Sequence, residues 1–164
     1  MDQWGKRVYN FARRYANDDH FANEVVQQTF IQAFEKLDQL KDPTKLQSGL
    51  YRIASNNCIS QGRRLARRRQ LEENGLIHTP DPANPSQVVE RKELRDMVLK
   101  VLQMIPPEQR QVIIMKEYEG LKFREIAGIL EASENTIKAR MYYGLDAKRK
   151  IMIQNKLNKD LYYE

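Results

Sequence analysis

Apolar residues recur every three or four positions along most of the chain, which is the spacing of one face of an α-helix. Two such stripes lie between residues 4 and 37, and residues 17–19 between them are typical helix-capping residues. Residues 41–44 form the next break, because they contain a proline that disfavours helix at the residue before it. A third helix is predicted from about Ser48 to Arg64 or beyond.

A change of composition at residues 72–87 divides the chain. This segment holds three prolines and one glycine without a sustained period, so we expect a flexible linker. Helical spacing resumes at residue 88, stops at Pro106-Pro107, and then continues to Glu119-Gly120, a C-terminal glycine signal. No run alternates with period two for long enough to be a strand. The prediction is an all-α fold, in which residues 1–70 and 88–164 form two small helical domains joined by a flexible linker at 71–87.

Residues 121–145 have the pattern of a helix-turn-helix. The apolar face of its first helix comprises Phe123, Ile126, Ala127 and Leu130. Glu131 stands in the turn where glycine is common, so a left-handed conformation there would carry a modest strain cost. Ser133 is a good N-cap for the second helix. The side chains left facing outward suit major-groove base edges and phosphates, and include Asn135, Thr136, Lys138 and Arg140. The alternative is an ordinary helical hairpin with a solvated face.

The composition favours a polyanionic partner. The 164 residues carry a net charge of +6 and a pI of about 9.4, and cations that neutralise phosphates release counterions. Cys58, His20 and His78 are the only cysteine and histidines, so we expect no intramolecular disulfide, no zinc site and no cofactor. The chain lacks the apolar segment of a signal peptide or a membrane span, so we expect a cytoplasmic protein without membrane insertion. Nothing pairs a nucleophile with a base, which argues against an enzyme.

Several stretches resemble the bacterial sigma factors. LQMIPPEQRQVIIMKEYEGLKFREIAGIL is similar to their region 4, with matches at Ile105-Pro106, Arg110, Val112, Glu119-Gly120 and residues 125–127. ANEVVQQTFIQAFEKLDQL and LYRIASNN resemble their region 2. Both sets occur in order across residues 5–66 and 88–150 without a region 3, which is the layout of the extracytoplasmic-function (ECF) class. The resemblance implies an alternative sigma factor that binds core RNA polymerase and directs transcription initiation at specific promoters.

The resemblance also implies three binding surfaces. The one for the coiled coil of the polymerase β′ subunit matches Glu24, Gln27, Gln28 and Gln32. The surface expected to bind the melted −10 element includes Lys45, in the loop 41–47. It also includes Tyr51, Arg52, Asn56, Asn57, Arg63 and Arg64. Region 4 contacts the β flap and reads the −35 element, for which the matching residues are Arg124, Ser133, Asn135, Thr136, Lys138 and Arg140. Promoter DNA and an anti-sigma factor, which holds many family members inactive, are the other expected partners.

Several alternatives stay open. Tyr51 is either a core aromatic or a base contact. The arginines between residues 63 and 69 form either a phosphate-binding stripe or a solvated helix end. Gly49 replaces the tryptophan that region 2 usually has, so promoter melting or local packing differs, or a nearby aromatic fills the space. The competing functions are a stand-alone helix-turn-helix regulator and a degenerate polymerase-binding protein that does not melt promoters.

Overall fold

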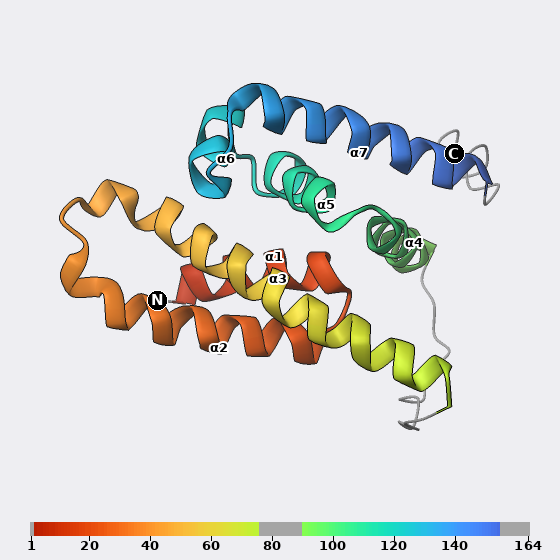
Figure 1. The fold of residues 1–164 in the computed structure, drawn as a ribbon, viewed down its shortest axis with the longest axis horizontal. Helices are drawn as coiled ribbons and strands as arrows, with labels where there is room; N and C mark the ends of the chain where they lie inside the picture. Colours follow the sequence, from red (N-terminus) through yellow and green to blue (C-terminus); the bar gives the residue numbers. More distant parts are fainter. Residues whose placement is uncertain (1, 76–89, 155–164) are drawn as a thin grey trace.

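The computed structural model describes residues 2–75 and 90–154, and within these ranges the predicted all-α fold class is confirmed (Figure 1). The N-terminal bundle consists of α1 (Asp2–Ala16), α2 (Asp19–Lys36), the short turns η1 (Leu37–Gln39) and η2 (Pro43–Lys45), and α3 (Leu46–Glu73). The C-terminal bundle consists of α4 (Glu90–Met104), α5 (Pro107–Ile113), the π-helical turn η3 (Ile114–Tyr118), α6 (Phe123–Leu130) and α7 (Glu134–Gln154).

Capping side chains produce the first two helix breaks. Asp18 caps α2, because its side chain accepts a 2.8 Å hydrogen bond from the backbone N–H of Phe21. Asp42 caps η2 in the same way, with a 3.0 Å bond from the backbone N–H of Thr44. Pro43 occupies the first turn, where a missing N–H removes no helical hydrogen bond. Both breaks therefore arise where the sequence pattern predicts them.

Helix α3 continues into the segment expected to be the linker. It begins at Leu46, directly after η2, and runs for 28 residues to Glu73. Its last eleven residues, 63–73, contain neither glycine nor proline and consist of good helix formers. Gly75 follows with a left-handed φ of 71°. The remainder of the expected linker, residues 76–87, lies outside the described residues.

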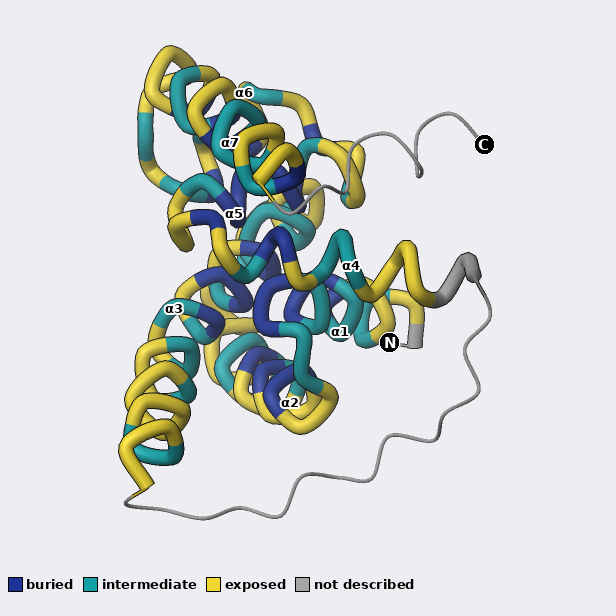
Figure 2. The backbone as a smooth tube through the Cα atoms, turned by 90° about the vertical axis from the view of Figure 1, so that its right-hand side faces the viewer, coloured by how far each residue is buried: buried dark blue, intermediate teal, exposed yellow. Residues whose placement is uncertain are grey.

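The two bundles share one hydrophobic core. Helix α1 packs against α2 and α3 of its own bundle, and also against α4, α5 and η3 of the other. Phe11 on α1 and Ile113 on α5 are both completely buried and belong to the same cluster. Buried positions concentrate around α1, which lies between α2 and α5, whereas the C-terminal half of α3 is mostly exposed (Figure 2). The fold therefore places the two bundles side by side.

Close packing of α5 and α7 orients the helix-turn-helix. At Gly144 an added Cβ would lie 2.7 Å from Cδ1 of Ile113 and 3.2 Å from Cβ of Gln109, so only glycine fits without a shift. On α6, Ile129 is 2% exposed, whereas Leu130 is only half-buried. Phe123, Ala127 and Leu130 all pack against the core, so the predicted apolar face of α6 is confirmed, and Ile129 is the position that it missed. The helix has only eight residues, and its last inward-facing position is set by contact with α7.

Candidate nucleic-acid interface

The turn between α6 and α7 has the geometry that the sequence predicts. Ser133 caps α7, because its Oγ accepts a 3.1 Å hydrogen bond from the backbone N–H of Thr136. Glu131 adopts the left-handed conformation, with φ 53° and ψ 47°, although it has a side chain. Ile137 and Met141 are buried, which turns the opposite face of α7 to the solvent.

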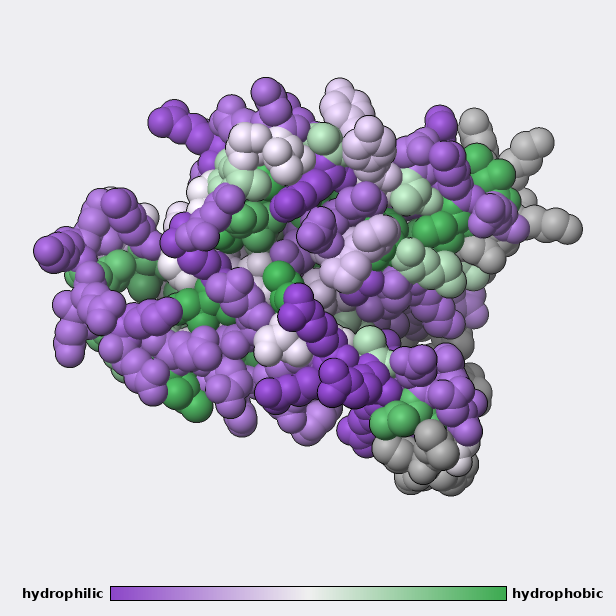
Figure 3. Space-filling view, viewed as in Figure 1, coloured by the Kyte–Doolittle hydropathy of each residue, from purple (hydrophilic) through white to green (hydrophobic). Residues whose placement is uncertain are grey.

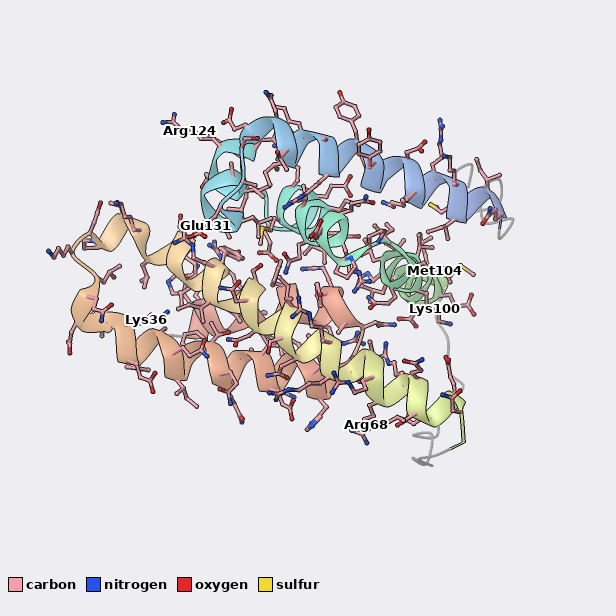
Figure 4. The ribbon with its side chains drawn as sticks, viewed as in Figure 1. Lys36, Arg68, Lys100, Met104, Arg124 and Glu131 are labelled. Atoms are coloured by element: carbon pink, nitrogen blue, oxygen red, sulfur yellow. The ribbon has the colours of Figure 1, made fainter. Side chains whose placement is uncertain are left out.

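The outer face of α7 carries the side chains expected to read duplex DNA. Asn135, Thr136 and Lys138 are exposed, and Arg140 is partly buried. Arg124 lies at the outer end of α6 and points away from the body of the molecule (Figure 4). Most of these side chains lie on the first two turns of α7, and Arg124 adds a cation from the first turn of α6. Such a surface suits both phosphate oxygens and base edges in a major groove.

A groove between α2 and α3 brings together two sets of predicted site residues. It encloses about 650 Å³, and its lining includes Glu24, Gln27, Gln28, Gln32, Asn57 and Arg64. The Asn57 side chain donates 3.2 Å hydrogen bonds to Oγ1 of Thr29 and to Oε1 of Gln32. Residues expected to contact different partners therefore share one polar concave surface.

Tyr51 is a core residue in this structure. Its side chain is 3% exposed, and its ring meets the ring of Phe11 edge to face, with centroids 6.0 Å apart. The phenol donates a 2.6 Å hydrogen bond to Oε2 of Glu119, on the C-terminal bundle. Burial and this hydrogen bond raise the pKa of Tyr51 well above its ordinary value. Of the two interpretations of Tyr51, the core aromatic describes the arrangement observed.

Arg52, the neighbouring residue, contacts the helix-turn-helix directly. Its guanidinium donates to the backbone carbonyl of Gly128 at 2.6 Å and to that of Ile129 at 3.4 Å. It also lies 3.2 Å from a carboxylate oxygen of Glu131. Glu131 faces α3, on the opposite side of α6 from Arg124 (Figure 4). The side chain expected to contact the −10 element is thus bound to the other bundle.

Polar contacts between the bundles also involve residues that the sequence did not single out. Ser55 and Gln111 are both buried and exchange two hydrogen bonds, of 3.0 and 3.2 Å. Gln111 interrupts an apolar run, and such a polar position inside a core stripe is the signal that could have indicated a buried partner. No comparable signal marks Glu119, because it coincides with the expected end of a helix.

Two family models match the chain. The model for sigma-70 region 2 matches residues 1–68, and the model for sigma-70 region 4 matches residues 95–147. The ECF RNA polymerase sigma-E factor of Escherichia coli is 29% identical over 135 residues, which are 76% of this chain and 70% of that protein. The ECF RNA polymerase sigma factor SigE of Mycolicibacterium smegmatis is 30% identical over 145 residues, covering 87% of this chain and 56% of that one. The chain belongs to the ECF class of sigma factors. It therefore functions as a sigma factor, and its two bundles correspond to regions 2 and 4.

Two solved structures share the fold of this sigma factor. The sigma factor RpoE from Bartonella quintana, in complex with the anti-sigma factor NepR, aligns over 92% of both chains with a TM-score of 0.69 and 23% identity. CnrH, in complex with the cytosolic domain of CnrY, aligns over 93% of this chain and 84% of that one, with a TM-score of 0.66 and 21% identity.

None of the helices in residues 2–75 and 90–154 is long and apolar enough to cross a membrane.

The last turns of α3 give the sigma factor a strongly cationic edge. The arginines at positions 63, 64, 67, 68 and 69 are all exposed. A hydrophilic band follows the C-terminal half of α3 (Figure 3), on which Arg68 points outward (Figure 4). Asn56 and Lys45 are also exposed, nearer the start of the helix. Lys45, Asn56, Arg63 and Arg64, the predicted −10 residues other than Tyr51, Arg52 and Asn57, are therefore open to solvent.

Gly49 leaves an open space where region 2 of related sigma factors usually has tryptophan. A Cβ added at Gly49 would meet no atom within 4 Å. Beside it lies a cavity of about 230 Å³ between the end of α2 and the start of α3. Its lining is mainly aliphatic, including Leu37, Leu46 and Ile53, and contains no aromatic side chain. The alternative that a nearby aromatic fills this space is therefore wrong for this structure.

Proposed function

We propose that this sigma factor binds the β′ coiled coil of core RNA polymerase through the groove between α2 and α3. The observation that supports this most directly is the row of exposed polar side chains along α2, which ends at the groove. Glu24, Gln27 and Gln28 are exposed on three successive positions of this row. Packing with α1 occupies the opposite face of α2, where Phe21 and Val25 are buried. A partner helix can therefore dock on the polar row without disturbing the core.

The C-terminal bundle reads the −35 element through α7 in this proposal. Asn135, Lys138 and Arg140 lie within the first two turns of the helix, where side chains reach base edges when a recognition helix enters the major groove. Arg124 adds a phosphate contact from the adjacent helix. The region 4 family also implies contact with the β flap of the polymerase.

The N-terminal bundle contacts the melted −10 element along α3. Asn56 and Lys45 supply polar contacts to bases and backbone, and Arg63 and Arg64 neutralise phosphates. Tyr51, Arg52 and Asn57 are also predicted to contact the −10 element, but the first two contact the C-terminal bundle here and the third is bonded within its own bundle. These three side chains can therefore contribute to −10 binding only if their contacts within the protein are replaced by contacts with DNA.

An anti-sigma factor is the further partner that we propose. The support comes from the two solved structures that share the fold. RpoE from Bartonella quintana is in complex with the anti-sigma factor NepR, and CnrH is in complex with the cytosolic domain of CnrY. In this proposal the chain works in the cytoplasm, where core RNA polymerase is found, and supplies binding surfaces without catalysis of its own.

Reconstitution with purified bacterial core polymerase tests the proposal. We expect a stable complex and promoter-specific transcripts from a random promoter library. The double variant Gln27→Ala, Gln28→Ala should weaken complex formation, because it removes two polar groups from the groove. Glu35→Ala, at an exposed position of α2 outside the groove lining, is the matched control.

The outcomes separate the competing functions. Failure of the wild-type chain to bind core polymerase would refute the proposal. Specific binding to duplex DNA without polymerase would favour a stand-alone regulator. A stable complex that yields transcripts from pre-melted promoters but none from duplex promoters would show a protein that does not melt promoters. Gly49→Trp is then the variant to test, because it fills the open space beside the cavity.

A further inference from the structure

Buried polar side chains are hydrogen-bonded in pairs across the contact between the two bundles, although Oε1 of Glu119 is left without a hydrogen bond. Ser55 on α3 and Gln111 on α5 bond to each other twice, and Tyr51 on α3 bonds to Glu119 just after η3. All four residues are buried or partly buried. Pairing of buried donors and acceptors is expected of surfaces that fit each other, because an unpaired buried polar group is costly. The arrangement of the two bundles is therefore a specific one.

Arg52 is the centre of a second set of contacts, which we call the Arg52 latch. The latch consists of the Arg52 guanidinium, the carbonyls of Gly128 and Ile129 at the end of α6, and the carboxylate of Glu131. Carbonyls at the end of a helix lack helical partners and carry partial negative charge, so a cation is favourable there. Glu131 adds its charge from a left-handed residue, at the cost of backbone strain.

The latch brings the two proposed DNA-binding surfaces too close for a promoter. Ser133, the N-cap of α7, follows Gly128 by five residues, which span at most about 18 Å. The guanidinium of Arg52 therefore lies within roughly 20 Å of the start of α7. The −10 and −35 elements are separated by about 25 base pairs, or about 85 Å along the duplex at 3.4 Å per step. A chain in this arrangement cannot engage both elements at once.

We propose that the observed arrangement is an autoinhibited closed state, in which Arg52 binds the helix-turn-helix in place of −10 DNA. This inference rests on the proposed function of Arg52 and α7. Opening frees the Arg52 guanidinium and the buried Tyr51 for DNA, and it also allows α7 to move towards the −35 element. The two events are coupled, because one side chain serves both the latch and the DNA.

Two substitutions on the C-terminal side of the contact test this without altering a proposed DNA-binding residue. Glu131→Gly removes the carboxylate and places the residue best suited to the left-handed turn, so the C-terminal bundle should remain folded. Glu119→Ala removes the acceptor of the Tyr51 hydrogen bond. We expect the ratio of open to closed chains to rise about twofold to fivefold for Glu131→Gly. A rise of about tenfold is expected for Glu119→Ala, whose bond is shielded from solvent.

Spin labels report the opening directly in the full chain. Glu35→Cys on α2 and Tyr143→Cys on α7 provide exposed labelling sites on the two bundles. Cys58 should stay unlabelled, because it is completely buried and burial raises the pKa of its thiol. Pulsed electron paramagnetic resonance then measures the distance distribution. Glu134→Gln is the matched control for Glu131→Gly, because it also removes one carboxylate, at an exposed residue of the first turn of α7.

The result expected is a longer-distance population in Glu131→Gly, in Glu119→Ala and most strongly in the double variant, but not in the control. With polymerase bound, apparent affinity for a promoter duplex should rise by the same factor as the open fraction, because the latch competes with DNA. An unchanged distance distribution in the double variant would overturn the latch. A changed distribution with unchanged promoter affinity would overturn the inhibitory role. If neither the wild type nor the opened chain binds polymerase, the proposed function fails and the inhibitory role fails with it, while the distances still report the latch.

Discussion

Replacement of Arg110 should show how α4 ends. The guanidinium is only 9% exposed, yet the four acceptors around it are backbone carbonyls. Nε donates to Leu102 at 2.7 Å, Nη2 donates to Gln103 and Ile105 at 2.9 Å each, and Nη1 donates to Tyr15 at 3.0 Å. Three of these carbonyls are at the C-terminal end of α4, where helical N–H partners run out before the two prolines. Arg110 thus replaces the missing turn of helix.

The size of the effect follows from this geometry. Arg110→Met leaves the carbonyls facing an apolar side chain of similar length, so little cavity forms and the loss is mainly polar. We expect the free energy of unfolding to fall by about 3–5 kcal/mol, because several buried carbonyls lose their donor and each unsatisfied buried group costs about 1–3 kcal/mol. Arg110→Lys keeps a cation near the negative ends of α1 and α4 but cannot form the planar fork, so a loss of about 2 kcal/mol is expected.

Urea unfolding followed by helical circular dichroism measures these losses by linear extrapolation. Arg67→Met is the matched control, because Arg67 is exposed on α3 and the same atoms are exchanged. We expect the control to stay within about 0.5 kcal/mol of the wild type. If Arg110→Met cost no more than the control, or if Arg110→Lys were as stable as the wild type, the carbonyls would not need the guanidinium. The account of how α4 ends would then be refuted.

Other substitutions isolate single groups. Ser133→Ala should lower the free energy of unfolding by about 1 kcal/mol in the same urea assay, and Ser133→Thr should restore most of it, because a hydroxyl caps α7. Arg140→Ala should weaken −35 binding by about 1–3 kcal/mol, measured by fluorescence anisotropy against a scrambled duplex, and an unchanged preference would mean that Arg140 contacts no base. Hydrogen bonds donated by Tyr9 and Arg13 lower the pKa of Asp19 below its ordinary value of 3.8. Asp19→Asn should therefore be less stable than the wild type above about pH 5, and the difference should vanish as the pH falls through the folded-state pKa, which acid titration of the two proteins can check.

Local features of the chain were predictable because their causes are local. The helix break before Phe21 depends on a hydrogen bond to a residue three positions earlier, so its signal lies within one turn. The cap at Ser133 and the left-handed turn at Glu131 are of the same kind. The motifs of the two regions also determined the family, since they occur in order along most of the chain. These predictions needed no knowledge of which helices touch.

The contact between the bundles was not predictable from periodicity. Val8, Phe11, Ala12 and Tyr15 form the apolar stripe expected on α1, and all four are buried. A stripe shows only that a face is covered, and α1 is covered by both bundles. Two small domains joined by a linker produce the same stripe as two bundles with a common core. The sequence therefore predicted the buried residues of α1 correctly without distinguishing these arrangements.

Tyr51 and Arg52 show the same limit within the candidate site. Both have side chains that suit bases and phosphates, and no neighbour in the sequence determines whether DNA or protein meets them. Their actual partners, Glu119 and the turn at Glu131, follow by 68 residues or more. Residue chemistry therefore predicted what these side chains can bind, whereas the structure showed which of the possible acceptors they contact.

The polar character of this contact has a consequence for the proposed opening. Ser55 and Gln111 lose two hydrogen bonds when the bundles separate, but both groups then regain water, so the net cost is small. Only Oε2 of Glu119 is hydrogen-bonded, to Tyr51, whereas its Oε1 is buried without a hydrogen bond and lies 3.7 Å from the nearest nitrogen of Arg14, so separation returns water to that oxygen and offsets part of the lost bond. A contact made only of apolar residues would lack both features. Burial of apolar surface therefore holds the closed state together with the Arg52 latch and the Tyr51–Glu119 bond, and a partner that covers part of that surface can shift the balance.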